Sequence, residues 1–213
     1  MKRLIVIFIV AAHLASCGKH SDITDIQLHP DAELIHIDSL MQSSPDSALQ
    51  TLLSCHSEYE VRGTSSDINA HYQALLTSET LYKTDNVQSN RTELQAAIHY
   101  FDSLAVRYPD NDDIIMLSVR SHYMNGVGYY ENDSVVEACQ EYLNALEIME
   151  EHFDIDELSE YEIKLMGLTY TRLGELYFYN GTAQPAIEFY RYALIYFSKL
   201  SNFNLSNTYR RIG

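Results

Sequence analysis

The sequence has few basic residues and no tryptophan. Lysine and arginine together number 14 against 30 aspartates and glutamates, which gives a formal net charge of -16. Nucleic-acid binding requires clusters of Lys and Arg that displace counterions from phosphate, so this composition argues against a nucleic-acid partner. The acidic surface is best explained by solvation. With 213 residues, of which 46% are hydrophobic, the chain can bury a core of one large or two small domains.

Recognisable catalytic and metal-binding motifs are also lacking. The sequence has no His-Glu-x-x-His, Cys-x-x-Cys or Gly-x-Ser-x-Gly motif and no phosphate-binding glycine loop, and its nine histidines are scattered. The acidic pairs Glu150-Glu151 and Asp154-Asp156 lack the ligand spacing and central glycine of an EF-hand. We therefore expect no bound metal, no cofactor and no enzymatic activity.

No apolar run is long enough to cross a bilayer, which takes about 20 residues. The run at residues 4–12 follows two basic residues and has the length of a signal-peptide core. It leads into Leu14-Ala15-Ser16-Cys17, which resembles the lipobox of bacterial lipoproteins. The resemblance implies a signal peptide at residues 1–16 and a Cys17 whose acyl chains hold the protein in a lipid bilayer. The alternative is an ordinary secretory signal cleaved after Ser16.

The other two cysteines are Cys55 and Cys139. Export would permit a disulfide between them. Cys139, however, follows Ala138 on a predicted helix, and small isolated thiols on helices usually fill cores. We therefore favour two thiols over one bridge.

Residues 170–193 carry the spacing of a tetratricopeptide repeat. Gly174 would let a second helix approach closely, Ala186 would complement it, and Tyr190 would fill the gap between repeats. The same spacing occurs upstream from Gly126. The downstream copy reads Tyr170-x2-Leu173-Gly174-x2-Tyr177 and Ala186-x3-Tyr190-x2-Ala193, and the upstream copy has Gly126, Tyr129, Ala138, Tyr142 and Ala145.

Helical periodicity extends through most of the remaining chain and predicts an all-α fold, a tetratricopeptide-like solenoid of antiparallel helix hairpins over residues 31–213. A polar tether at residues 17–30 would precede it. Loops are expected at residues 58–66 and 84–90. Residues 209–213 repeat the start of the motif, so we expect the solenoid to continue beyond residue 213.

Together with the lipobox, two phrases resemble a family of tetratricopeptide lipoproteins found in Bacteroidetes: Asp38-Ser39-Leu40-Met41 and Ser44-Pro45-Asp46-Ser47-Ala48-Leu49. The resemblance implies a cell-envelope lipoprotein of the outer membrane. It leaves open which side the protein faces, because residues 18–21 lack the acidic run linked to surface display. Asp133-Ser134-Val135 also resembles an O-glycosylation sequon of these bacteria, which makes Ser134 a candidate glycosylation site.

In tetratricopeptide solenoids the first helix of each hairpin lines a concave groove. The groove predicted here is aromatic and nearly neutral, without the Lys and Arg pairs that clamp a peptide carboxylate, and it suits an apolar or extended segment of a protein or peptide partner. Alternatively, its tyrosines pack between neighbouring helices. The predicted groove residues are Arg120, Tyr123, Val127, Tyr130, Leu168, Thr171, Glu175 and Phe178.

The leading functional hypothesis is therefore a membrane-anchored scaffold that binds a protein or peptide. One alternative is the extracytoplasmic input domain of a longer tetratricopeptide regulator. Another is glycan capture, as in the starch-binding lipoproteins that contain such helices. Those proteins usually stack sugars on Trp, which this sequence lacks.

Overall fold

The protein is all-helical in the part of the chain that the structure describes, which confirms the prediction that the fold is all-α. The structure is a computed structural model and describes residues 28–62, 67–86 and 91–200. The predicted signal peptide, Cys17 and most of the tether lie outside these ranges, as do residues 201–213. The described ranges contain no strand and eight helices: α1 (Ala32–Ser43), α2 (Pro45–Arg62), α3 (Ile68–Lys83), α4 (Arg91–Arg107), α5 (Asp112–Glu131), α6 (Val135–His152), α7 (Glu160–Tyr179) and α8 (Ala183–Phe197).

Side-chain caps fix the starts of several helices. The Asp67 carboxylate accepts a hydrogen bond from the Asn69 amide at 2.9 Å at the start of α3. At the start of α7, Ser159 and Glu162 form a reciprocal capping box, with distances of 3.4 and 2.6 Å. These bonds satisfy amides that have no partner within the helix. The caps therefore set where α3 and α7 begin.

The predicted loop at residues 58–66 is wrong in its first half, because α2 extends to Arg62. Residues 58–62 contain neither glycine nor proline, so nothing in them opposes the helix that starts at Pro45. Asn180 and Gly181 form the turn between α7 and α8. Gly181 has a φ of 75°, a conformation that favours glycine.

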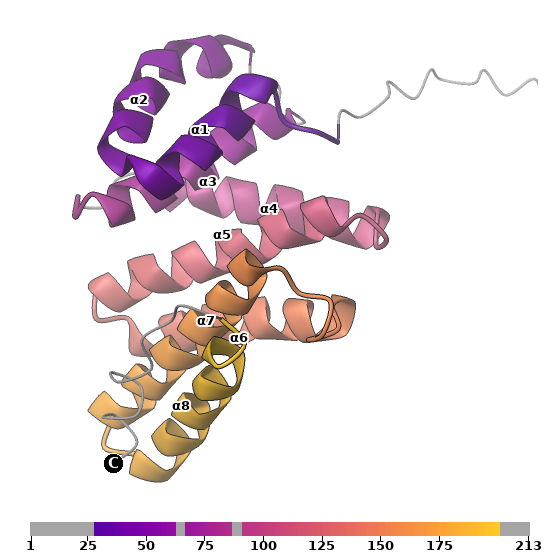
Figure 1. The fold of residues 1–213 in the computed structure, drawn as a ribbon. Coiled ribbons are helices and arrows are strands. Elements are labelled where there is room, and N and C mark those ends of the chain that lie inside the picture. The colour runs from indigo at the N-terminus through magenta and orange to yellow at the C-terminus, as the bar shows by residue number, and fades with distance from the viewer. Residues whose placement is uncertain (1–27, 63–66, 87–90, 201–213) are drawn as a thin grey trace, which may run out of the picture.

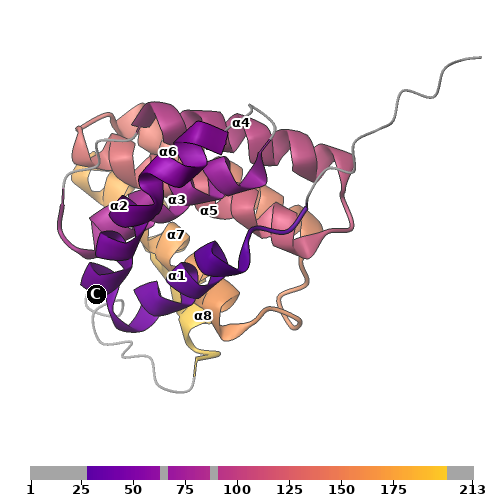
Figure 2. The same cartoon turned by 90° about the horizontal axis from the view of Figure 1, so that it is seen from above.

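Consecutive helices pack against one another along the whole described chain, from α1 and α2 at one end to α7 and α8 at the other (Figure 1). Helix α3 also contacts both α1 and α5, so these odd-numbered helices share one face. In the view from above, α4 lies along one outer edge (Figure 2). The arrangement places the odd-numbered helices beside one another, where they can line a common site.

Three helical glycines lie directly under aromatic rings. A Cβ built on Gly174 would stand 2.6 Å from the Tyr190 ring, and one on Gly126 would stand 2.6 Å from the Tyr142 ring. Gly167 has the same relation to Phe197, at 2.4 Å. Tyr190 was predicted to fill the gap between repeats, and in the structure its ring packs on Gly174 within the α7–α8 pair.

The two cysteines of the described chain, Cys55 and Cys139, form no disulfide. Cys55 is buried, and its thiol lies 3.3 Å from a carboxylate oxygen of Glu33 in α1. Cys139 is half-buried on α6. Both positions agree with thiols that pack between helices.

A buried histidine links α4, α5 and α6. His122 Nδ1 lies 2.6 Å from Glu141 and its Nε2 lies 3.3 Å from Asp102, while Ser118 donates a hydrogen bond of 2.5 Å to the same Asp102 oxygen. Burial by itself lowers the pKa of His122. The hydrogen bonds to the two carboxylates outweigh burial and raise the pKa to about 9. The imidazolium therefore keeps its charge at neutral pH.

Raising the pH from about 6 to about 9.5 is expected to lower the free energy of unfolding by up to about 3 kcal/mol through His122. The pKa is above the usual 6.5 in the folded state, so the stabilisation is complete below the unfolded pKa and is lost as the pH rises through about 9. Urea melts across this range should show the fall. In His122→Gln the part of the slope due to His122 should vanish, and an unchanged slope in that variant would contradict the assignment.

Candidate functional site

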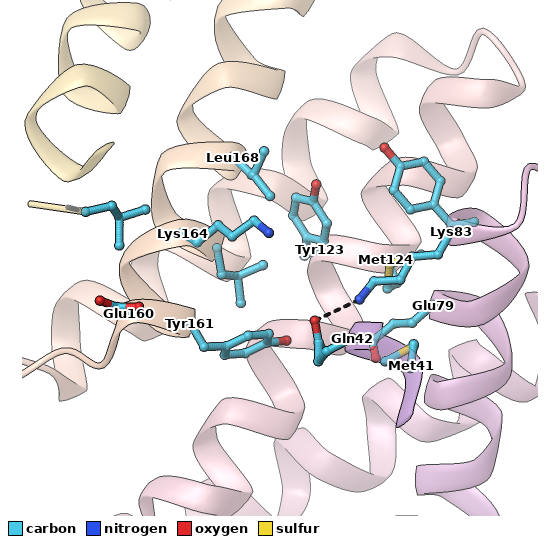
Figure 3. Close-up of a pocket in the computed structure, with 13 residues that line it drawn as sticks. Met41, Gln42, Glu79, Lys83, Tyr123, Met124, Glu160, Tyr161, Lys164 and Leu168 are labelled. Carbon is cyan, nitrogen blue, oxygen red and sulfur yellow. Dashed lines mark hydrogen bonds between the residues drawn. The ribbon is translucent and has the colours of Figure 1, made fainter. Parts of the chain in front are cut away.

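A pocket of about 600 Å³ opens between the odd-numbered helices (Figure 3). Such a volume is within the range of pockets that bind ligands in proteins, about 300 to 1,000 Å³. All its lining residues but Leu200 belong to α1, α3, α5 and α7. The lining consists of Met41 and Gln42; Glu79, Tyr82 and Lys83; Tyr123 and Met124; Glu160, Tyr161, Lys164, Leu165 and Leu168; and Leu200.

Arg120 of α5 connects the helices that line the pocket. Its guanidinium bonds the Glu79 carboxylate at 2.9 and 2.5 Å and the Asp38 carboxylate at 2.8 and 3.1 Å. The Tyr72 hydroxyl donates a further hydrogen bond of 2.5 Å to Asp38, and the pocket residue Tyr161 places its ring 5.7 Å from the guanidinium carbon. One arginine of α5 thereby ties α1, α3 and α7 to one point.

The pKa values of Asp38 and Arg120 are shifted by the contacts between Arg120 and the two carboxylates. Burial tends to raise the pKa of Asp38, but the charge and hydrogen bonds of Arg120 overcome burial and lower it. The pKa of Arg120 is raised despite its burial, chiefly because Glu79 lies beside it. Asp38 and Arg120 therefore both carry charge at neutral pH.

A second arginine contacts tyrosine side chains in and near the pocket lining. Arg172 of α7 donates hydrogen bonds to the Tyr82 hydroxyl at 2.5 Å and to Glu175 at 2.8 Å. Its guanidinium carbon also lies 5.5 Å from the centre of the Tyr130 ring. Burial raises the pKa of the adjacent Tyr123 to about 12, so this pocket phenol is neutral at physiological pH. Tyr123 can therefore offer a hydrogen bond and an apolar ring face without negative charge.

The predicted groove residues fall into several environments. Tyr123 and Leu168 line the pocket. Arg120, Val127 and Glu175 are buried, the two charged ones within the networks just described. Tyr130 and Thr171 are half-buried, and Phe178 is 56% exposed near the end of α7. The structure therefore brings two of the eight together with residues that the prediction did not name.

Two lysines of the pocket were missed. Lys83 extends from the end of α3 and donates a hydrogen bond of 3.1 Å to the Gln42 side chain, and Lys164 extends from α7 (Figure 3). Partial burial lowers the pKa of Lys83, Glu79 opposes this shift, and the nearby charge of Lys164 adds to it. Lys164 lies on the same helix as the predicted Leu168, one turn earlier. That spacing was the one signal in the sequence that could have found it.

Ser134, the candidate glycosylation site, lies between α5 and α6 at the N-cap of α6 and makes no side-chain capping hydrogen bond there. Asp133 before it has a φ of 57°, which marks a tight turn. The sequence has three further Asp-Ser-apolar triplets, and their serines lie inside helices: Ser39 in α1, Ser47 in α2 and Ser103 in α4.

The described residues contain no group of three or more His, Cys, Asp or Glu side chains placed to hold a metal ion. Within the same ranges, no helix has the length and apolar character needed to cross a bilayer. Comparison with known proteins finds no family model and no curated protein that matches this chain. The geometry of the pocket is therefore the basis for a functional assignment.

Proposed function

We propose that this protein is a non-enzymatic, tetratricopeptide-like scaffold of the cell envelope that binds a segment of a partner protein between its odd-numbered helices. Its anchor would be an acylated Cys17 in the outer membrane. The observation that carries the proposal is the pocket lined by α1, α3, α5 and α7. A solenoid of helix hairpins presents the first helix of each pair on its inner face, and this lining matches that expectation.

The character of the lining supports binding over catalysis. Three tyrosines, two methionines and three leucines contribute hydroxyls and apolar surface. Phenols and thioethers adapt to varied apolar side chains, which suits recognition of a peptide segment. The two arginines pair with carboxylates from neighbouring positions and stabilise the helices that line the pocket.

Site-specific photo-crosslinking tests the proposal. A photoreactive residue placed at position 161, at the pocket, should yield a discrete adduct in envelope extracts of the native host. The same residue at Val106, which is 85% exposed on α4 and does not line the pocket, serves as the control. The adduct should weaken when Leu168→Asp is added. Equal labelling at both positions, or no adduct at position 161, would reject a binding role for this pocket.

We expect Cys17 to be acylated, because the lipobox-like residues 14–17 follow a short apolar run. The intact mass of the protein from the membrane fraction should equal the chain from residue 17 with its acyl chains. Cys17→Ser should remove this mass and release the protein from membranes, because anchoring would then lack its lipid. A soluble, unmodified wild-type product that begins at another residue would contradict the expectation.

A further inference from the structure

The pocket holds two positive charges that face each other. Lys83 and Lys164 come from opposite walls, and both ammonium groups point toward the space between them (Figure 3). Among the described residues, no carboxylate lies within 4 Å of either ammonium to form an ion pair. Like charges on two walls of one pocket repel, so an anion between them would be stabilised from both sides.

The carboxylates that line the same pocket do not fill this role. Both oxygens of Glu79 accept hydrogen bonds from Arg120, at 2.9 and 2.5 Å. Glu160, at the start of α7, also lines the pocket, but it forms no ion pair with Lys83 or Lys164. The hydrogen-bond partner of Lys83 that the structure shows is the neutral Gln42 amide oxygen. The two ammoniums are therefore placed for an anion from outside the described chain.

Apolar surface adjoins the space between the lysines. The Tyr123 ring and the Leu168 side chain stand beside Lys164, and Met124 lies on the Lys83 side (Figure 3). An anion that bound here would bring its neighbouring groups against these side chains. Burial of an apolar group there would contribute in proportion to the area removed from water.

We propose that the pocket binds an acidic residue of a partner segment, with its carboxylate between Lys83 and Lys164 and an adjoining large apolar side chain against Tyr123 and Leu168. This inference rests on the proposed scaffold function and specifies its ligand. The chain as a whole is strongly acidic, with a formal net charge of -16. A partner carboxylate is therefore repelled elsewhere and attracted at this pair, which fixes the register of the bound segment.

Fluorescence anisotropy with the purified full chain tests the inference. The probes are two labelled peptides with Gly-Ser flanks, one centred on the tripeptide Leu-Glu-Phe and one on Leu-Gln-Phe. The acidic peptide should bind about tenfold more tightly, since a hydrogen bond to a charged group is stronger than one to a neutral group. The difference should shrink at about 0.3 M salt, because the lysines are accessible to ions.

Variants locate the effect. In Lys83→Met/Lys164→Met the preference for the acidic peptide should disappear, while the melting temperature stays close to wild type because neither lysine has a carboxylate partner in the described chain. The matched control is Arg107→Met/Arg191→Met. It removes two positive charges from α4 and α8, outside the pocket, and should keep the preference.

The outcomes separate this inference from the proposed function. Equal binding of the two peptides, or a preference that survives the double lysine change, overturns the carboxylate site and leaves the scaffold proposal standing. If neither peptide binds but the crosslink at position 161 still forms, the carboxylate site is likewise overturned and the scaffold proposal stands. If neither peptide binds and no crosslink forms, both the carboxylate site and the scaffold proposal are overturned. If free 3-phenylpropionate bound more tightly than the acidic peptide, the claim that the carboxylate belongs to a peptide segment would be rejected in favour of a small carboxylic acid.

Discussion

Replacing Arg120 with methionine is expected to lower the free energy of unfolding by about 3 to 5 kcal/mol. The side chain of Arg120 is 8% exposed, and its guanidinium pairs with Glu79 and Asp38, whose side chains are 9% and 21% exposed. Without the arginine, two buried carboxylates lose their main partner and must be either charged and unpaired or protonated. Urea melts of the wild type and the variant measure the loss.

Two further measurements tie that loss to charge. Adding Asp38→Asn and Glu79→Gln to Arg120→Met should recover most of the lost stability, because an uncharged replacement of a buried ion cluster is often tolerated. In the single variant the two carboxyls should have raised pKa values, so its stability should increase as the pH falls from about 7 to about 5.

Arg191→Met on the exposed face of α8 is the matched control and should change stability by less than about 0.5 kcal/mol. A cost below about 1 kcal/mol for Arg120→Met would show that the cluster does not hold α1, α3 and α5 together.

Local signals in the sequence were sufficient to predict where most of the helices lie. Helices α3 and α6 follow the apolar periodicity of residues 68–83 and 135–152, with Asp67 as the cap of α3 and a turn at residues 132–134 before α6. Interactions within a few residues decide these features. The same local reasoning missed the last turn of α2, where the composition was polar but contained no helix breaker before Gly63.

The pocket could be predicted only in part, because it depends on how helices far apart in the sequence are rotated and stacked. Tyr123 and Leu168 were predicted from their position relative to the repeat glycines. Lys83 was missed because it belongs to a helix pair without that glycine spacing. His122 shows the same limit, since its two carboxylates come from α4 and α6, and no spacing rule connects them.

Arg120 and Glu175 were predicted to line the groove but are buried, and the reason is related. A single repeat assigns such residues to the inner face, and it cannot show that neighbouring helices will close over them. Carboxylates and phenols from α1, α3 and α7 complete the shell around Arg120, so their partners become visible only once the helices are stacked. Contacts between helices that are far apart in the sequence decided which of the predicted groove residues remained exposed.

Replacing Gly174 with leucine is expected to destabilise the protein by about 1 to 3 kcal/mol or more, through overpacking against Tyr190. Even a single Cβ at Gly174 would stand 2.6 Å from a ring carbon of Tyr190, which is 2% exposed and has little room to move. Alanine improves helix propensity by about 1 kcal/mol, so Gly174→Ala should show a smaller loss than leucine.

A double-mutant cycle identifies the cause. Tyr190→Leu alone should destabilise by leaving a cavity, whereas Gly174→Ala should cost less in the Tyr190→Leu background than in the wild type, because the smaller side chain leaves room for the new methyl group. Gly181 is the control glycine: a Cβ there meets nothing within 4 Å, and its φ of 75° suits asparagine. Gly181→Asn should therefore be close to neutral in both backgrounds. Additive costs for Gly174 and Tyr190, with no coupling, would show that the ring does not set the spacing between α7 and α8.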